Sequence, residues 1–240
     1  MESKASASRE IESPCDVLRP STSNAERTLC VLGLGGGGTS MVAGCLRLAG
    51  VPMGERLNEA NNEDQEFHDL IQCRPLLDGT GNLLPERLEQ FRAFIEYRNE
   101  RHPVWGWKHP ETLRILPQVL DRLRNPHLLY IFRDVHAVAQ RNHKRLGLDH
   151  PLSLRASLGH LTAMVNAIEQ LSAPTLLISY ERCLRHPEKF LRLLSSFCGL
   201  ELTQQDCQDL ASFVRPDRVS GEIDAQARAR DRAYYTPECD

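Results

Sequence analysis

The sequence predicts a three-layer α/β/α fold built around a central parallel sheet. Three short and continuously apolar runs, at residues 28–33, 128–132 and 175–180, have the length and composition of buried strands. Amphipathic segments, whose apolar residues recur every three or four positions, alternate with these runs. Strands that are apolar on both faces and alternate with helices are typical of a parallel sheet with helices packed on both sides.

The helices are predicted from the same spacing. Met41, Cys45 and Leu48 follow the first strand at helical intervals, within a predicted helix over residues 40–49, and Gly50 ends it. The remaining predicted helices cover residues 84–95, 113–123, 154–171 and 190–197.

The two ends of the chain differ in composition from its middle. Residues 1–26 are rich in Ser, Glu and Arg and have no apolar periodicity, so we expect a disordered arm there. Residues 216–240 alternate acidic residues with arginines and predict a polar tail. The 240-residue chain therefore contains one predicted domain, residues 27–215, which is large enough to bury a substantial core.

Composition excludes several classes of protein. The 29 basic and 32 acidic residues give a formal net charge of −3, which argues against non-specific binding of nucleic acid. No stretch approaches the roughly 20 apolar residues that span a membrane, and the N-terminus lacks the apolar segment of a secretory signal. The eight cysteines form no C-x-x-C pair, so neither a zinc site nor a disulfide framework is indicated. These features predict a cytoplasmic protein with reduced thiols.

A glycine-rich loop follows the first predicted strand. It has the frame of a phosphate-binding loop in which Thr39 replaces the usual lysine. Glycines allow backbone N–H groups to approach an anion, and the positive end of the following helix adds to the attraction. A dinucleotide-binding turn and a plain strand-to-helix turn are the alternatives. The residues predicted to hold phosphate are Gly35, Gly36, Gly37, Gly38, Thr39 and Ser40.

The missing lysine separates two classes of phosphate-binding enzyme. A nucleoside triphosphatase or kinase uses this lysine on the β and γ phosphates, together with an acid at a strand end that holds magnesium. Here the strand at residues 128–132 is followed by Arg133, a cation suited to pair directly with phosphate. The pattern predicts a nucleotide held without a metal, and a P-loop nucleotide kinase is the alternative.

Four segments in the same order resemble those of the P-loop sulfotransferases, in particular the bacterial members. Besides the loop, the segments are Trp105-Gly106-Trp107-Lys108-His109-Pro110, Phe132-Arg133-Asp134, and Ser179-Tyr180-Glu181 with His186-Pro187-Glu188. The resemblance covers residues 28–200 and extends to the carbohydrate sulfotransferases. It implies transfer of a sulfuryl group from 3′-phosphoadenosine-5′-phosphosulfate (PAPS) to a hydroxyl or amine of a carbohydrate or a small molecule.

The resemblance also implies roles for single residues. The loop would hold the 5′-phosphosulfate, and Arg133 would bind the 3′-phosphate. Arg141 stands where the family often has a serine that binds the same phosphate. Lys108 corresponds to a lysine that reaches the sulfuryl group in carbohydrate sulfotransferases, and Tyr180 with Glu181 corresponds to a mostly structural signature. No metal is implied.

One departure from the family concerns the loop. The family carries an arginine or a lysine where this chain has Gly36. Because sulfuryl transfer spreads negative charge over several oxygens, losing that cation is costly unless another replaces it. Lys108 or an arginine of the tail is the predicted replacement. The alternative is a homologue that binds the nucleotide with little catalysis.

The acceptor needs a general base, which the family takes from a Glu or a His shortly after the first helix. The candidates are Glu66 and His68, followed by Glu63 and His109. Trp105 and Trp107 either present an aromatic face to the acceptor or pack in the core.

Overall fold

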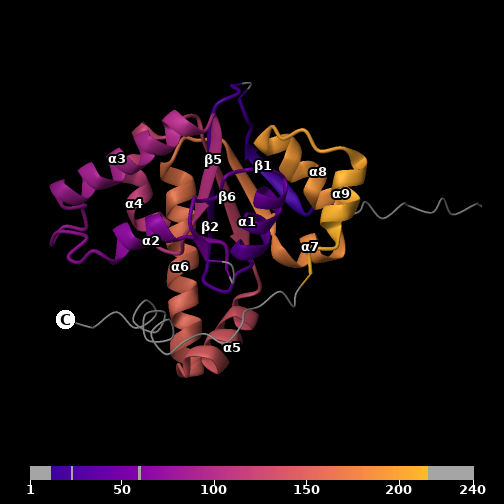
Figure 1. The fold of residues 1–240 in the computed structure, drawn as a ribbon. Helices are drawn as coiled ribbons and strands as arrows, with labels where there is room; N and C mark the ends of the chain where they lie inside the picture. The colour runs from indigo at the N-terminus through magenta and orange to yellow at the C-terminus, as the bar shows by residue number, and fades with distance from the viewer. Residues whose placement is uncertain (1–11, 23, 59–60, 216–240) are drawn as a thin grey trace, which may run out of the picture.

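The fold is a five-stranded sheet with helices on both faces, as the computed structural model shows (Figure 1). The structure describes residues 12–22, 24–58 and 61–215. The strand order is β1-β7-β6-β2-β5, and the predicted three-layer α/β/α architecture is confirmed. The four parallel strands are β2 (Arg27–Gly33), β5 (Val104–Lys108), β6 (Pro126–Phe132) and β7 (Thr175–Ser179).

Strand β1 (Cys15–Arg19) has no counterpart among the predicted elements. It pairs antiparallel with β7, with Cys15 opposite Ile178. Within β1 the Cys15 side chain is the buried one, so the segment shows no apolar period, yet its backbone completes the sheet. The prediction of a disordered arm is therefore wrong over Cys15–Arg19, and the sheet is mixed. Residues 1–11 and the predicted tail at 216–240 lie outside the described residues.

The predicted helices correspond to five of the observed ones. These are α1 (Thr39–Leu48), α3 (Pro85–Arg101), α4 (Thr112–Val119), α6 (His150–Gln170) and α8 (Pro187–Cys198). A short 3₁₀ turn, Leu120–Arg122, completes the segment that the spacing predicts as one helix with α4. The other helices are α2 (Gln65–Gln72), α5 (Val135–Leu146), α7 (Tyr180–Arg185) and α9 (Gln204–Ala211), and β3 (Leu57–Asn58) pairs with β4 (Glu63–Asp64).

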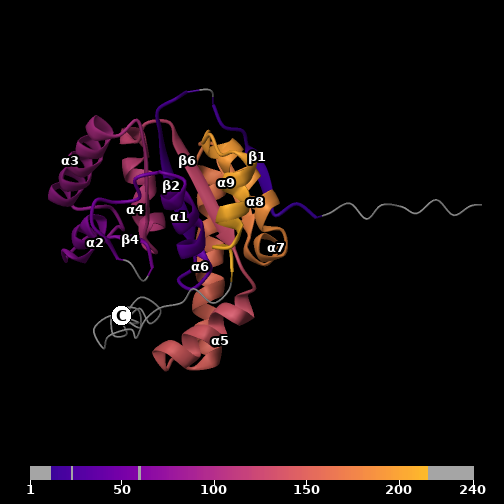
Figure 2. The ribbon, with the colours of Figure 1, turned by 45° about the vertical axis from the view of Figure 1, so that its right-hand side comes forward.

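The sheet separates two hydrophobic cores. Alternate residues of β2 point to opposite faces, so Leu29 and Val31 lie in one core while Cys30 and Leu32 lie in the other. Helices α1, α8 and α9 complete the first core, and α2, α3, α4 and α6 complete the second. Figures 1 and 2 show α3 and α4 on one side of the sheet and α8 and α9 on the other.

Strand β5 is short and contains Gly106, and for these reasons the sequence does not predict it. A Cβ atom at Gly106 would lie 2.5 Å from the carbonyl oxygen of Leu29 on β2. Glycine is therefore required for the two strands to pack at this point.

The carboxyl ends of the four parallel strands meet at one edge of the sheet. They end at Gly33 (β2), Lys108 (β5), Phe132 (β6) and Ser179 (β7). The segments that follow these strands carry all the predicted nucleotide-binding residues. Ligands of open α/β sheets bind at this edge, so the topology puts the predicted site where such folds have theirs.

Two further expectations concern thiols and membranes. No disulfide joins any two of the seven cysteines in the described part of the chain, and Cys239 lies outside it. Within residues 12–22, 24–58 and 61–215, no helix has the length and apolar character needed to cross a bilayer.

Candidate functional site

The glycine-rich loop leads directly into the N-terminus of α1. The N-cap residue Gly38 has a φ of 98°, no side chain caps the helix, and its first turn contains no acidic residue. Within the loop, the N–H of Gly37 donates to the carbonyl of Leu34 at 2.8 Å. In the described part of the chain, the positive end of α1 is therefore without a side-chain cap and without an acidic residue in its first turn, an arrangement that favours phosphate binding.

Tyr180, the first residue of α7, packs against this loop. A Cβ atom at Gly38 would overlap Cδ2 of the Tyr180 ring and lie 2.7 Å from Cε2. Gly38 is thus fixed as glycine both by its positive φ and by the aromatic ring beside it.

Arg133, immediately after β6, also contacts the Tyr180 ring. Its guanidinium carbon is 4.4 Å from the centre of the Tyr180 ring, a cation–π contact. Its Nη1 donates to the carbonyl oxygen of Gly36 at 2.7 Å. The Nε of Arg133 is buried and has no acceptor among the described residues. A buried donor without an acceptor, close to an uncapped helix N-terminus, is a group that an anion could satisfy.

The segment after β6 is held by the residue that follows Tyr180. Glu181 accepts a hydrogen bond from the backbone N–H of Asp134 at 3.0 Å. Asp134 in turn caps α5 by accepting from the N–H of Ala137 at 2.6 Å. Tyr180 and Glu181 therefore position Arg133 from two sides, which gives this sequence pair a physical role.

Arg141 reaches the same loop from α5. Its Nη1 donates to the carbonyl oxygen of Gly36 at 3.2 Å, so both predicted nucleotide-binding arginines converge on one loop residue. The structure thus brings the loop, Arg133 and Arg141 together at the carboxyl edge of the sheet.

Lys108 ends β5 beside the strand that carries the loop. It lies opposite Val31 in the parallel register, and its side chain is buried. Its Nζ pairs with Oε1 of Glu63 at 2.8 Å. Because both groups are buried, each one neutralises the charge of the other.

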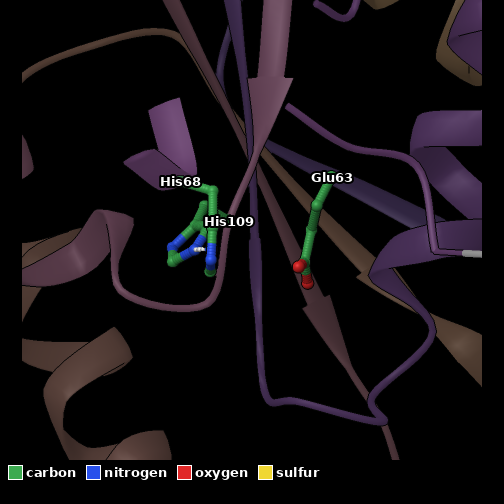
Figure 3. Close-up of side chains that lie close together, drawn as sticks. All are labelled: Glu63, His68 and His109. Atoms are coloured by element: carbon green, nitrogen blue, oxygen red, sulfur yellow. Dashed lines mark hydrogen bonds between the residues drawn. The ribbon is translucent and has the colours of Figure 1, made fainter. Parts of the chain in front are cut away.

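Glu63 also belongs to a cluster with two histidines (Figure 3). One carboxylate oxygen of Glu63 and one ring nitrogen each of His68 and His109 lie within 4.8 Å of one another. The rings of His68 and His109 are joined by a hydrogen bond of 3.2 Å between Nδ1 and Nε2. Three of the four predicted base candidates therefore lie together, next to Lys108.

The direction of the hydrogen bond between the histidines follows from a third group. The backbone N–H of Glu111 donates to Nδ1 of His109 at 3.2 Å, so the neutral His109 ring carries its proton on Nε2 and donates to His68. A metal ligated by Nε2 of His109 would require that proton to move to Nδ1, where the Glu111 N–H already donates. A carboxylate and two imidazoles suit a divalent metal, but these two hydrogen bonds favour a pair of histidines in which His109 donates to His68.

Glu66, the fourth candidate, is held by a different partner. It forms a hydrogen-bonded ion pair with Arg98, whose side chain is buried. Arg98 also pairs with Asp64 at 3.3 Å, and Asp64 caps α2 by accepting from the N–H groups of Glu66 and Phe67. Burial raises the pKa of the Asp64 carboxyl to about 6, against the lowering effect of Arg98 and of the two N–H groups. No sequence pattern distinguishes Arg98 from the other charged residues of α3.

Both tryptophans belong to the second core. Trp105 and Trp107 are buried, and their indole N–H groups donate to Asn99 and to Thr112, each at 3.0 Å. Trp107 stacks on Phe67 with 5.2 Å between the ring centres. Of the two roles that the sequence leaves open, core packing is the observed one.

Comparison with known proteins identifies the architecture. No protein-family model and no curated protein matches the sequence. The structure is similar to sulfotransferase STF1 from Mycobacterium tuberculosis (12% identity, 78% of this chain and 71% of that one, TM-score 0.51). It is also similar to the sulfotransferase domain of the curacin biosynthetic pathway (17% identity, 85% and 82%, TM-score 0.50) and to sulfotransferase STF9 from Mycobacterium avium (15% identity, 88% and 76%, TM-score 0.50). These three similarities, at identities of 12–17%, concern the fold, and the chain has the fold of the P-loop sulfotransferases.

Proposed function

We propose that this protein is a sulfotransferase that moves a sulfuryl group from PAPS to a hydroxyl or amine of a carbohydrate or small-molecule acceptor. The proposal rests mainly on the surroundings of Arg133. Its buried Nε has no acceptor among the described residues, and it stands beside the uncapped N-terminus of α1. An anionic nucleotide would satisfy both groups.

The residues that would hold PAPS come from the loop and from the end of β6. Residues 35–40 and the first turn of α1 would hold the 5′-phosphosulfate through backbone N–H groups other than that of Gly37, which donates to Leu34, and through the hydroxyls of Thr39 and Ser40. Arg133 would pair with the 3′-phosphate. When bound, PAPS supplies the sulfuryl group, and the protein contributes orientation and positive charge.

We assign the general base to Glu63. The lone pairs at Nδ1 of His68 and Nδ1 of His109 accept hydrogen bonds from His109 and from the Glu111 N–H in the neutral pair. Glu66 is bound by Arg98. Glu63 is a carboxylate that accepts from Lys108 through Oε1, and a carboxylate beside a lysine at this edge of the sheet can act as the base for an acceptor hydroxyl. Lys108 would then stand between the base and the sulfuryl group, where it stabilises developing negative charge.

The site suits PAPS better than a nucleoside triphosphate with magnesium. Thr39 occupies the position of the kinase lysine, and Arg133 follows the strand end where a kinase would carry an acid for the metal. Two arginines that contact the loop, Arg133 and Arg141, would supply positive charge in the absence of magnesium.

The proposal is tested by binding first and by transfer second. Adenosine 3′,5′-bisphosphate is expected to raise the melting temperature of the protein, and ADP, which lacks the 3′-phosphate, to raise it less. Radioactive sulfate should then pass from labelled PAPS to members of a panel of carbohydrates, phenols and amines. An unchanged melting temperature would refute the nucleotide assignment. Magnesium-dependent phosphate transfer from ATP would support a kinase, and stabilisation without sulfate transfer would support a nucleotide-binding homologue.

A further inference from the structure

Gly36, at the tip of the loop, brings no side-chain charge to the site. It has a φ of +82°, and a Cβ atom there would lie 3.2 Å from Nη1 and 3.4 Å from Cδ of Arg141. The arginine side chain thus lies along the space into which a side chain at position 36 would project. The observed position of the Arg141 side chain depends on glycine at position 36, because a larger residue there would displace the arginine.

The peptide between Gly36 and Gly37 is fixed at both of its polar ends. Its carbonyl oxygen accepts from Nη1 of Arg133 at 2.7 Å and from Nη1 of Arg141 at 3.2 Å. Its N–H, on Gly37, donates to Leu34 at 2.8 Å. Two positive guanidinium groups that share one carbonyl oxygen repel each other, and a bound phosphate or phosphosulfate would relieve that repulsion.

The sequence suggests two replacements for the missing loop cation, namely Lys108 and the arginines of the tail. In the described part of the chain, neither makes the contact with Gly36 that Arg141 makes. Lys108 directs its buried ammonium to Glu63 at 2.8 Å. The arginines of the tail lie outside the described residues. Among the described residues, Arg141 is the cation beyond Arg133 that contacts Gly36.

We propose that Arg141 supplies, from α5, the positive charge that related sulfotransferases carry on the loop itself. It then acts on the 5′-phosphosulfate, and not as a second ligand of the 3′-phosphate, which its place in the sequence suggests. This inference rests on the proposed function, because it assumes that PAPS occupies the loop. The forked guanidinium can hold the Gly36 carbonyl and approach the phosphosulfate from the same side.

Two ligands that differ only at the 3′ position test the assignment. Isothermal titration would give the dissociation constants of PAPS and of adenosine 5′-phosphosulfate, which lacks the 3′-phosphate, for the wild type and for Arg141→Ser. If Arg141 acts at the 5′ end, the variant binds both ligands more weakly by the same factor, about tenfold or more for one lost charge-assisted contact. The matched control is Lys144→Ser, which removes one charge from an exposed position of the same helix and is expected to leave both affinities unchanged.

Three results would overturn the inference. A loss confined to PAPS would place Arg141 at the 3′-phosphate. Unchanged affinity for both ligands, with a melting temperature equal to that of the wild type, would remove Arg141 from the site. An Arg141→Lys variant that loses as much affinity as Arg141→Ser would show that positive charge is not what the side chain supplies. Wild-type protein that binds neither ligand would instead refute the proposed function, so the two failures are distinguishable.

Discussion

The guanidinium of Arg133 lies over the face of the Tyr180 ring, 4.4 Å from its centre. The same ring also packs against Gly38 at the start of α1. One aromatic side chain therefore sets the distance between the loop and the arginine that would bind the nucleotide.

We expect substitutions of Tyr180 to separate the aromatic ring from its hydroxyl. Tyr180→Phe keeps the ring and should bind adenosine 3′,5′-bisphosphate as the wild type does. Tyr180→Leu removes the cation–π contact and should weaken binding by about 2- to 30-fold, corresponding to about 0.5–2 kcal/mol. Titration calorimetry checks both values. Equal affinities for the two variants would show that the ring does not position Arg133.

Gly38→Ala should destabilise the protein and weaken nucleotide binding. The new Cβ meets the Tyr180 ring, and the residue keeps a φ of +98°. The matched control is Gly147→Ala, where φ is +64° but no atom lies within 4 Å of the added Cβ. The control should cost about 1–2 kcal/mol of unfolding free energy for the left-handed backbone alone. Gly38→Ala should cost about 1–3 kcal/mol more because of the overlap. Denaturant unfolding measures both, and similar losses would argue against the packing of Tyr180 on the loop.

Glu63→Gln should lower turnover while leaving nucleotide affinity close to that of the wild type. The amide oxygen can still accept from Lys108, but the side chain can no longer take a proton, so kcat should fall by about 10²–10⁴-fold. Glu66→Gln, in the neighbouring helix, should keep most of the activity because Glu66 pairs with Arg98. A larger loss of kcat in Glu66→Gln than in Glu63→Gln would reverse the assignment of the base.

Lys108→Met should lower turnover and also lower stability. The substitution removes a cation from the proposed sulfuryl site, which is expected to reduce kcat by about 10²–10³-fold. It also removes the ammonium that neutralises the buried Glu63 carboxylate, at a cost of about 3–5 kcal/mol. The double variant Lys108→Met with Glu63→Gln should recover part of the melting temperature and none of the turnover. Recovery of turnover would contradict the role of Lys108.

Asp64 should give the unfolding free energy a pH dependence of its own. Burial raises its pKa in the folded protein to about 6, above the ordinary value of 3.8. Between about pH 4 and 6 the folded state therefore binds more protons than the unfolded state, and this contribution to stability is lost as the pH rises through that window. Asp64→Asn, which can still cap α2, should lack this loss. The difference in unfolding free energy between the wild type and Asp64→Asn, measured from pH 4 to 7, should fall as the pH rises. A flat difference would contradict the raised pKa.

The sequence predicts the parts of this fold that depend on local pattern. The strands β2, β6 and β7 are continuously apolar because helices cover both of their faces, and the five predicted helices have a regular apolar stripe. Strand β5 is missed because Gly106 breaks its pattern for a reason that lies in the neighbouring strand, the carbonyl of Leu29. Strand β1 is missed because backbone pairing with β7, and not an apolar pattern of side chains, holds it in the sheet.

The candidate site also has one part that the sequence predicts and another part that it does not. The glycine-rich loop is visible in the sequence because its backbone conformation restricts residue type, as at Gly38. The pairing of Lys108 with Glu63 and the convergence of Arg133 and Arg141 on Gly36 join residues far apart in the chain. No spacing rule encodes such contacts, so they follow only from the packed structure.

Strand β1 has a consequence for any shortened form of the chain. Its backbone satisfies the outward-facing N–H and C=O groups of β7, and composition alone would place it outside the domain. A protein that begins at residue 27 would present those groups to solvent, next to the apolar side chains of Leu176 and Ile178. An unpaired edge strand can pair with the same edge of another molecule, so we expect such a protein to self-associate. By pairing with β7, residues 15–19 cover this edge of the sheet.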